Sequence, residues 1–302
     1  MTSARNMPTL SSIFTRICLA LLVASSLTVV TAAPSFVRRD IPRHRGCGTH
    51  ISAERRVSSE ARFRTHRHAA SRENATATLD VYFHVVFANQ TTEGGYVPDE
   101  AIERQVQVLN EDYNTTGVSF RLVNVTRIQS EEWFLKVAPE TEEETSMKEI
   151  FRYGNSSALN VWTVGFMEGD GKGLLGYATF PSDYESAPKK DGVVLLHSTM
   201  PDVGQAPYNK GRTLTHEAGH WAGLYHTFEG GCQGNGDFVD DTPAEKDAAY
   251  GCPSKKSTCP GGKQDPITNF MNYSDDLCME RFTDGQATRI RAQMRAFRAV
   301  DI

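Results

Sequence analysis

Three histidines in the stretch RTLTHEAGHWAGLYHTF, Arg212 to Phe228, constrain the fold of this chain more than any other feature. His216 and His220 are four residues apart, so on a helix they lie on one face, one turn apart. His226 follows six residues later, where a continuing helix would rotate it well off that face. Gly223 readily adopts the positive φ that ends a helix. The spacing therefore predicts a helix that stops at Gly223 and a turn that returns His226 to the other two histidines.

Three imidazoles brought together in this way are a typical ligand set for zinc. Three protein ligands leave one coordination position open, which is the catalytic rather than the structural arrangement of zinc. Glu217 lies about 100° further round the helix, beside the metal, where a general base toward a metal-activated water is needed. The alternative is a helix with incidental histidines, which the five fixed positions of the pattern disfavour. His84 and His197 stand alone in apolar strands, and we interpret them as core or edge residues.

The N-terminus has the features of a secretory signal peptide over residues 1–32. Basic residues Arg5 and Arg16 precede the apolar run Ile17–Val30, and small residues follow. The run is shorter than the roughly 20 residues of a membrane-spanning helix, so we expect a secreted, extracellular protein with no membrane partner. Five N-x-Ser/Thr sequons are candidate glycosylation sites: Asn74, Asn89, Asn114, Asn124 and Asn155.

Charge divides the rest of the chain. Residues 33–76 hold ten arginines and four acidic residues, a net charge of +6, whereas residues 77–302 hold 20 basic and 33 acidic residues, a net charge of −13. A basic segment of this kind can be a nucleic-acid-binding arm. In a secreted chain we favour a propeptide over residues 33–76 that docks by charge on its own catalytic domain, residues 77–302, with no nucleic-acid partner.

The pattern from Leu79 onward is typical of an α/β domain. Segments rich in β-branched and aromatic residues predict five strands: Leu79–Phe87, Val118–Val125, Leu159–Phe166, Gly173–Phe180 and Val193–His197. Helices are predicted after Pro98, over Thr145–Tyr153, at the three histidines and over Asp284–Arg298. We therefore expect a twisted, mixed five-stranded sheet backed by helices, and an irregular C-terminal subdomain after about residue 223.

The sequence HEAGHWAGLYH resembles the zinc signature HExxHxxGxxH of the metzincin metalloproteases, and NFMNY, Asn269 to Tyr273, is similar to their Met-turn. GLLGYATFP, GDFVDDTP and CMERFTDGQ resemble segments of the pappalysin family, especially its fungal extracellular metalloproteases. The resemblance covers about residues 79–300. It implies a secreted zinc endopeptidase, made as a preproenzyme, that hydrolyses extracellular proteins and serves the assimilation of protein.

The resemblance assigns roles to individual residues. His216, His220 and His226 would bind zinc, and Glu217 would activate water and then protonate the leaving amine. Met271 would form the hydrophobic floor of the site. The hydroxyl of Tyr273 would bind the oxyanion or an idle ligand position, unless Tyr273 is a purely structural tyrosine. An extended peptide substrate would pair with an edge strand, unless this is an ordinary glycine-rich strand: Gly173, Leu174, Leu175 and Gly176. The sequon at Asn272 lies inside the Met-turn, so we do not expect glycosylation there.

Four cysteines follow the histidine helix and allow three pairings. The resemblance implies disulfides Cys232–Cys259 and Cys252–Cys278. A second zinc site is disfavoured because no C-x-x-C pair is present. Oxygen ligands for calcium, as in some relatives, are offered between these cysteines, although a solvated acidic loop is the alternative: Asp237, Asp240, Asp241 and Thr242.

Cys47 is left unpaired in the motif RGCGT, inside the basic segment. A thiolate is a strong zinc ligand, so Cys47 resembles a cysteine switch that fills the open zinc position and keeps the precursor silent. The alternative is a spare thiol in a discarded leader.

Leu277 stands where some relatives carry an acid and select basic residues, so broad cleavage by a monomeric enzyme is expected. The rival function, a catalytically silent binding protein on the same fold, is disfavoured because Glu217 is retained.

Overall fold

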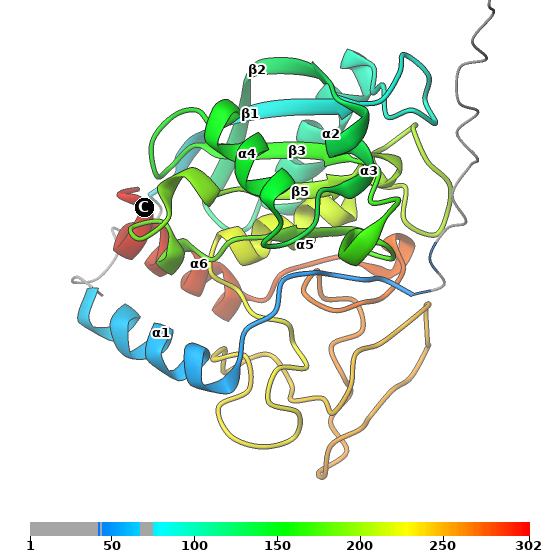
Figure 1. Ribbon diagram of the computed structural model, residues 1–302. Coiled ribbons are helices and arrows are strands. Elements are labelled where there is room, and N and C mark those ends of the chain that lie inside the picture. The colour runs from blue at the N-terminus through cyan, green and yellow to red at the C-terminus, as the bar shows by residue number, and fades with distance from the viewer. Residues whose placement is uncertain (1–41, 43, 67–74) are drawn as a thin grey trace, which may run out of the picture. The chain divides into compact units, whose positions relative to one another are not determined.

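The computed structural model describes Pro42 and residues 44–66 and 75–302 (Figure 1). The predicted signal peptide and the sequon at Asn74 lie outside the described residues. Within the described ranges, no helix is both long and apolar enough to cross a membrane. We refer to residues 44–66 as the N-terminal segment.

A mixed five-stranded sheet forms the centre of the fold, as predicted. Its strands are β1 (Ala77–Phe87), β2 (Val118–Gln129), β3 (Leu159–Val164), β4 (Gly176–Ala178) and β5 (Val193–Leu196). The order is β2-β1-β3-β5-β4, and β4 at one edge is the only one that pairs antiparallel within this sheet. All six residues of β3 are buried because helices cover both faces of the sheet.

Alternate residues of the strands feed two hydrophobic clusters. Val161 belongs to the cluster with helices α2 (Asp99–Asp112) and α5 (Arg212–Trp221). Its neighbour Trp162 belongs to the cluster with α3 (Glu131–Lys136) and α4 (Glu142–Phe151). The two helix pairs therefore lie on opposite faces of the sheet (Figure 1). The sequence did not predict α3, which is only six residues long.

The last helix, α6 (Asp284–Arg298), has the predicted bounds. Thr283 caps it, since its hydroxyl accepts from the amide of Gln286, whose side chain in turn accepts from the amide of Thr283. Before α6, residues 222–283 are irregular and contain only the 3₁₀ turn Asp276–Cys278. Four further 3₁₀ turns follow the strands β3, β4 and β5: Gly169–Gly171, Pro181–Asp183, Pro188–Lys190 and His197–Thr199.

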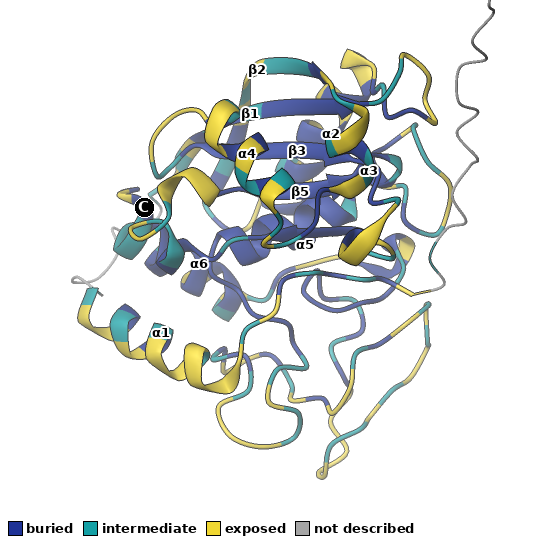
Figure 2. Ribbon diagram, viewed as in Figure 1, coloured by how far each residue is buried: buried dark blue, intermediate teal, exposed yellow. Residues whose placement is uncertain are grey.

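The N-terminal segment contains helix α1 (Ala53–His66), which the sequence did not predict. Most of α1 is exposed, whereas α5 is almost fully buried (Figure 2). Glu60 and Phe63, three residues apart on one face of α1, are its buried side chains. Glu60 forms an ion pair with Arg289 of α6. Contacts with the distant helix α6 therefore contribute to this helix, and they cannot be read from the local sequence.

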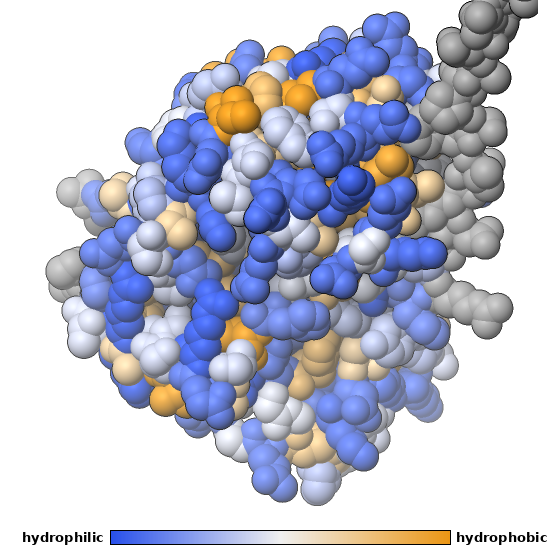
Figure 3. Space-filling model, in the orientation of Figure 1, coloured by the Kyte–Doolittle hydropathy of each residue, from blue (hydrophilic) through white to orange (hydrophobic). Residues whose placement is uncertain are grey.

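The surface is polar on the face shown in Figure 3, where apolar side chains gather only in small separate groups. Such scattered apolar residues are usual on soluble proteins, whereas broad apolar patches mark interaction sites.

His84 and His197 are both buried, as predicted for core residues. A ring nitrogen of His84 contacts the side-chain oxygen of Asn160 at 3.1 Å, and one of His197 contacts the carbonyl of Val164 at 3.2 Å.

Candidate zinc site

The three histidines of the opening motif converge at the end of α5. Nε2 of His220 lies 3.2 Å from Nε2 of His216 and 3.1 Å from Nε2 of His226. The helix ends at Trp221, and Gly223 has a φ of 98°. A Cβ at Gly223 would lie 2.5 Å from the side chain of Gln293 in α6. Both the backbone angle and the packing therefore select glycine at the turn that brings His226 back.

The opposite ring nitrogens fix the orientation of the imidazoles. Nδ1 of His216 lies 2.8 Å from the carbonyl of Phe270, and Nδ1 of His220 lies 2.8 Å from the carbonyl of Leu224. A carbonyl only accepts, so Nδ1 carries the proton and the lone pair of Nε2 faces the centre. Burial also lowers the pKa of all three rings, that of His226 to about 3. Neutral imidazoles with converging lone pairs fit zinc.

Cys47 supplies a fourth converging donor. Its Sγ and one nitrogen from each of His216, His220 and His226 all lie within 4.8 Å of one another. The N-terminal segment reaches this position along the edge of the sheet, between the sheet and the C-terminal loops (Figure 1). The amide of Gly48 donates to the carbonyl of Gly176 at 2.9 Å.

The predicted edge strand is shorter than expected. Of the four predicted residues only Gly176 lies in β4, and Gly173 has a φ of 101°. The amide of Leu175 donates to the carbonyl of Gly46 at 2.7 Å, and a Cβ at Gly46 would lie 2.5 Å from the carbonyl oxygen of Gly173. The main-chain groups of this edge are therefore paired with the N-terminal segment, which approaches closely because it carries glycine there.

Glu217 lies beside the histidine cluster and contacts the N-terminal segment. Its Oε2 accepts from the hydroxyl of Thr49 at 3.2 Å and from the thiol of Cys47 at 3.4 Å. Burial raises the pKa of Glu217 to about 8, although these two hydrogen bonds and Arg45 act in the opposite direction. The carboxyl group can therefore exchange a proton near neutral pH.

Met271 and Tyr273 lie on the other side of the cluster. Met271 is fully buried, and a Cβ at Gly219 would lie 2.3 Å from its sulfur. The glycine inside HEAGH therefore leaves room for the methionine under the histidine helix. The hydroxyl of Tyr273 lies 3.2 Å from Nε2 of His226, and burial raises its pKa.

Arg45 and Asp276 form a buried pair next to this cluster that the sequence did not reveal. The guanidinium of Arg45 contacts the carboxylate of Asp276 at 2.6 Å, the carbonyl of Ser274 and the hydroxyl of Thr213. It also stacks on the ring of Tyr208 at 5.0 Å. Leu277, the residue considered at this position, is instead 76% exposed. The acidic side chain that is buried here is that of Asp276, one residue earlier in the chain.

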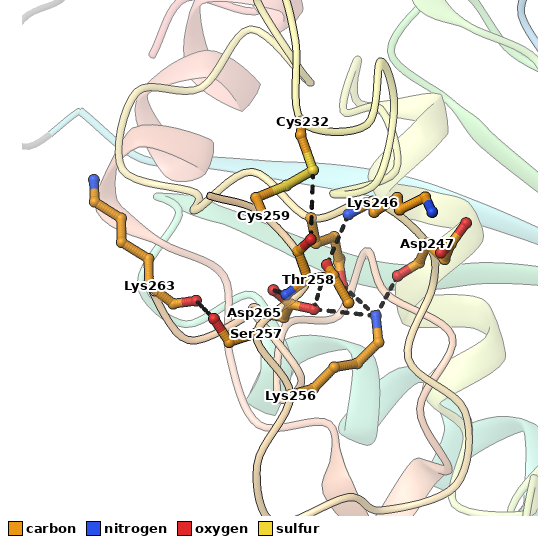
Figure 4. Close-up of a disulfide and its surroundings, with 10 residues drawn as sticks. Cys232, Lys246, Asp247, Lys256, Ser257, Thr258, Cys259, Lys263 and Asp265 are labelled. Atoms are coloured by element: carbon orange, nitrogen blue, oxygen red, sulfur yellow. Dashed lines mark hydrogen bonds and ion pairs between the residues drawn. A yellow bond between two sulfur atoms is a disulfide. The ribbon is translucent and has the colours of Figure 1, made fainter. Parts of the chain in front are cut away.

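Two disulfides tie the irregular part of the chain, Cys232–Cys259 and Cys252–Cys278, and Cys47 is free. These are the pairs that the resemblance implied. Figure 4 shows Cys232–Cys259 beside a polar network in which Asp265 accepts from the amide and the hydroxyl of Thr258. A loop of this kind has little apolar core, so cross-links of about 3 kcal/mol each are a large share of its stability.

The residues considered for calcium do not converge in the described structure, where the one potential metal-binding group is the Cys47–histidine cluster. Asp237 is buried and accepts from the hydroxyl of Thr242 at 2.7 Å and 2.8 Å. Asp241 instead binds the start of α6, where it accepts from the hydroxyl of Thr283 and the amide of Gly285. Asp240 is exposed.

The described sequons differ in exposure. Asn114, Asn124 and Asn155 are exposed, and Asn89 is partly exposed. Asn272 is fully buried, and its side-chain amide donates to Glu245 and to the carbonyl of Pro266. A glycan cannot be attached at Asn272 without breaking these contacts.

Comparisons with known proteins agree on one family. The family model described as Pregnancy-associated plasma protein-A matches residues 144–295. Extracellular metalloprotease 1 of Coccidioides posadasii is 43% identical over 230 residues, which covers 74% of this chain and 79% of the relative. The extracellular metalloprotease of Verticillium alfalfae is 39% identical over 292 residues, which covers 93% of this chain and 99% of the relative.

Solved structures give the same result. A promirolysin mutant of Tannerella forsythia is similar with a TM-score of 0.67 and 29% identity, covering 84% of this chain and 95% of that one. Mature mirolysin of the same organism, in complex with a cleaved peptide, has a TM-score of 0.61 and 30% identity, covering 72% and 91%. Together with the zinc-compatible histidine cluster, these matches show that the chain belongs to the pappalysin family of metzincins, as a secreted zinc metalloendopeptidase.

Proposed function

We propose that His216, His220 and His226 hold the catalytic zinc of this endopeptidase and that Glu217 is its general base. The observation that carries the proposal is the convergence of three neutral Nε2 atoms with a buried carboxyl group beside them. Zinc bound there would polarise the substrate carbonyl and make water a nucleophile near neutral pH. A catalytically silent binding protein would have no use for this carboxyl group.

The residues around the proposed zinc position have different roles in the reaction. Glu217 takes a proton from the attacking water and returns it to the leaving amine, which its place beside the histidine cluster allows. The hydroxyl of Tyr273, which lies 3.2 Å from Nε2 of His226, donates to the developing oxyanion. The edge at Leu175 and Gly176 binds the main chain of an extended polypeptide substrate.

We further propose that the N-terminal segment belongs to a propeptide that keeps the precursor inactive. Cys47 occupies the fourth donor position beside the histidines, and Thr49 engages Glu217. Arg55, Arg56 and Arg62 of this segment also pair with acidic residues of the catalytic part, Asp183, Glu229 and Glu185. These pairs support the electrostatic docking that the opposite net charges predict. All four donors of the cluster come from one chain, which supports a monomer.

Arg45 indicates the side chain that the specificity pocket accepts. The resemblance implies that the substrate residue after the scissile bond binds in this region. In the structure, Arg45 lies there and its guanidinium pairs with the carboxylate of Asp276. When the segment leaves, Asp276 becomes a buried carboxylate without its countercharge, which is costly. A substrate arginine or lysine would restore the pair. We therefore propose cleavage before basic residues in place of broad cleavage.

Profiling cleavage sites of the mature enzyme on a peptide library tests this specificity. We expect arginine or lysine after the scissile bond in wild type and loss of that preference in Asp276→Asn. A preference for apolar residues in the wild type would refute the role of Asp276. Casein clearing that survives a chelator would refute the zinc mechanism itself.

A further inference from the structure

Glu229 contacts one of the three histidines directly. Its Oε1 lies 3.3 Å from Nδ1 of His226, three residues earlier in the chain. The side chain of Glu229 is 21% exposed, and that of His226 is 3% exposed. The carboxylate therefore reaches the histidine from the solvent-facing side of the cluster.

This contact differs in kind from those of the other two histidines. His216 and His220 donate their Nδ1 protons to main-chain carbonyls, at Phe270 and Leu224. Both rings also project from the rigid helix α5. His226 projects from the irregular segment after Gly223, and its Nδ1 partner is a side chain. The ring of His226 also stacks on that of Phe228 at 4.7 Å, but its Nδ1 is held by a carboxylate, whereas the Nδ1 atoms of the other two rings are held by the backbone.

The N-terminal segment holds the same carboxylate from the other side. Arg56 of α1 donates to Oε2 of Glu229 at 2.9 Å, and the two side chains are largely buried against each other. Glu229 thus connects a residue of the removable segment to a ring of the metal-binding cluster. Among the described residues, Arg56 is the one arginine or lysine that forms an ion pair with Glu229, and this pair is lost when the segment leaves.

We propose that Glu229 is a positioning residue for His226, which fixes the ring with Nε2 toward the metal and strengthens it as a ligand. A carboxylate that accepts from the distal nitrogen of a metal-bound histidine orients the ring and raises its basicity. This inference rests on the proposed role of His226 as a zinc ligand. It adds that Glu229, unlike the backbone partners of the other rings, is a position where substitution tunes the affinity for zinc.

The test measures zinc affinity in the full-length chain carrying Glu217→Gln, which removes the proposed general base and so prevents self-cleavage. Zinc is titrated in competition with a chromophoric chelator. We expect about 10-fold weaker binding for Glu229→Gln, which keeps an acceptor but loses the charge, and about 100-fold for Glu229→Ala. The absorption spectrum of the cobalt-substituted protein should shift in the same order.

Two control variants separate positioning from docking. Glu185→Gln removes a carboxylate that pairs with Arg62 of the same helix but does not contact the histidines, and should leave zinc affinity unchanged. Arg56→Ala removes the ion pair between the N-terminal segment and Glu229 and should change the zinc affinity less than about threefold. If Arg56→Ala weakens zinc as much as Glu229→Gln, Glu229 acts through docking and the inference is wrong.

A further pair of measurements keeps the inference distinct from the proposed function. His226→Ala should lose zinc, and if it does not, the proposed ligand set fails. If His226→Ala loses zinc while both Glu229 variants bind it as wild type does, the ligand set stands and only the role of Glu229 fails. Thermal unfolding of the metal-free proteins checks that each Glu229 variant is folded.

Discussion

The hydroxyl of Thr49 donates to the same oxygen of Glu217 that the thiol of Cys47 contacts, at 3.2 Å and 3.4 Å. The two residues are two positions apart on an extended stretch, so their side chains point to the same side. One short stretch of the N-terminal segment therefore engages both the proposed general base and the open side of the histidine cluster.

Latency should consequently need both side chains. We expect purified wild-type precursor to be inactive, and Cys47→Ala to process itself during secretion. Thr49→Val keeps the shape but loses the hydroxyl, and in the presence of Cys47 it should give a small, measurable rise in precursor activity toward a short peptide. A wild-type precursor that is fully active without cleavage would reduce Cys47 to a thiol in a discarded leader.

Replacing the general base should separate chemistry from metal binding. Glu217→Gln should lower kcat/KM by at least about 10³-fold, because the water loses its proton acceptor, while zinc stays near one per chain. His226→Ala should lose both metal and activity. Zinc content by atomic absorption beside peptidase assays distinguishes the two, and an active Glu217→Gln enzyme would end the proposed role.

Salt should loosen the cleaved N-terminal segment. The pair Arg55–Asp183 is partly exposed, with side chains 52% and 27% exposed, whereas Arg45–Asp276 is buried. Screening shortens from about 10 Å at 0.1 M salt to about 3 Å at 1 M, so the exposed pairs weaken first. The apparent inhibition constant of a peptide spanning residues 44–66 should rise with salt. A constant that does not change between 0.1 M and 1 M salt would mean that the buried contacts alone hold the segment.

Asp237 should make stability depend on pH. Burial raises its pKa from 3.8 to about 7, although Thr242 and Val239 donate hydrogen bonds to it. The contribution of protonated Asp237 to the free energy of unfolding is therefore fully present below about pH 4. It is lost as the pH rises through 7, and the loss is about 4 kcal/mol at most. Urea unfolding at pH 5 and pH 8 should show this loss in wild type but not in Asp237→Asn. Parallel behaviour of the two proteins would contradict it.

The same variant tests calcium, which stays a hypothesis. If calcium binds at Asp237, adding calcium at pH 8 should stabilise the wild type. The wild type should then be more stable to urea than Asp237→Asn, which is the reverse of their order without calcium. Equal responses of wild type and Asp237→Asn to calcium would exclude this position as a ligand.

The sequence by itself determined the parts that depend on local geometry. Spacing along one helix brought His216 and His220 together, and the glycine after them predicted the turn to His226, because helix periodicity and backbone angles are local properties. The last helix was likewise expected near Asp284–Arg298, which are the bounds of α6. Segments rich in β-branched and aromatic residues predicted the strands, although β4 is shorter than the segment Gly173–Phe180.

The tertiary structure alone decided what distant residues do for one another. Arg45 and Asp276 are 231 positions apart, and Glu60 and Arg289 are 229 apart, so no periodicity relates them. Asp276 and Leu277 are neighbours in the chain, but the fold buries Asp276 and leaves Leu277 76% exposed. Helix α1 has few buried residues of its own. Its contacts with the catalytic part form only when the whole chain has folded, because they need both surfaces in place.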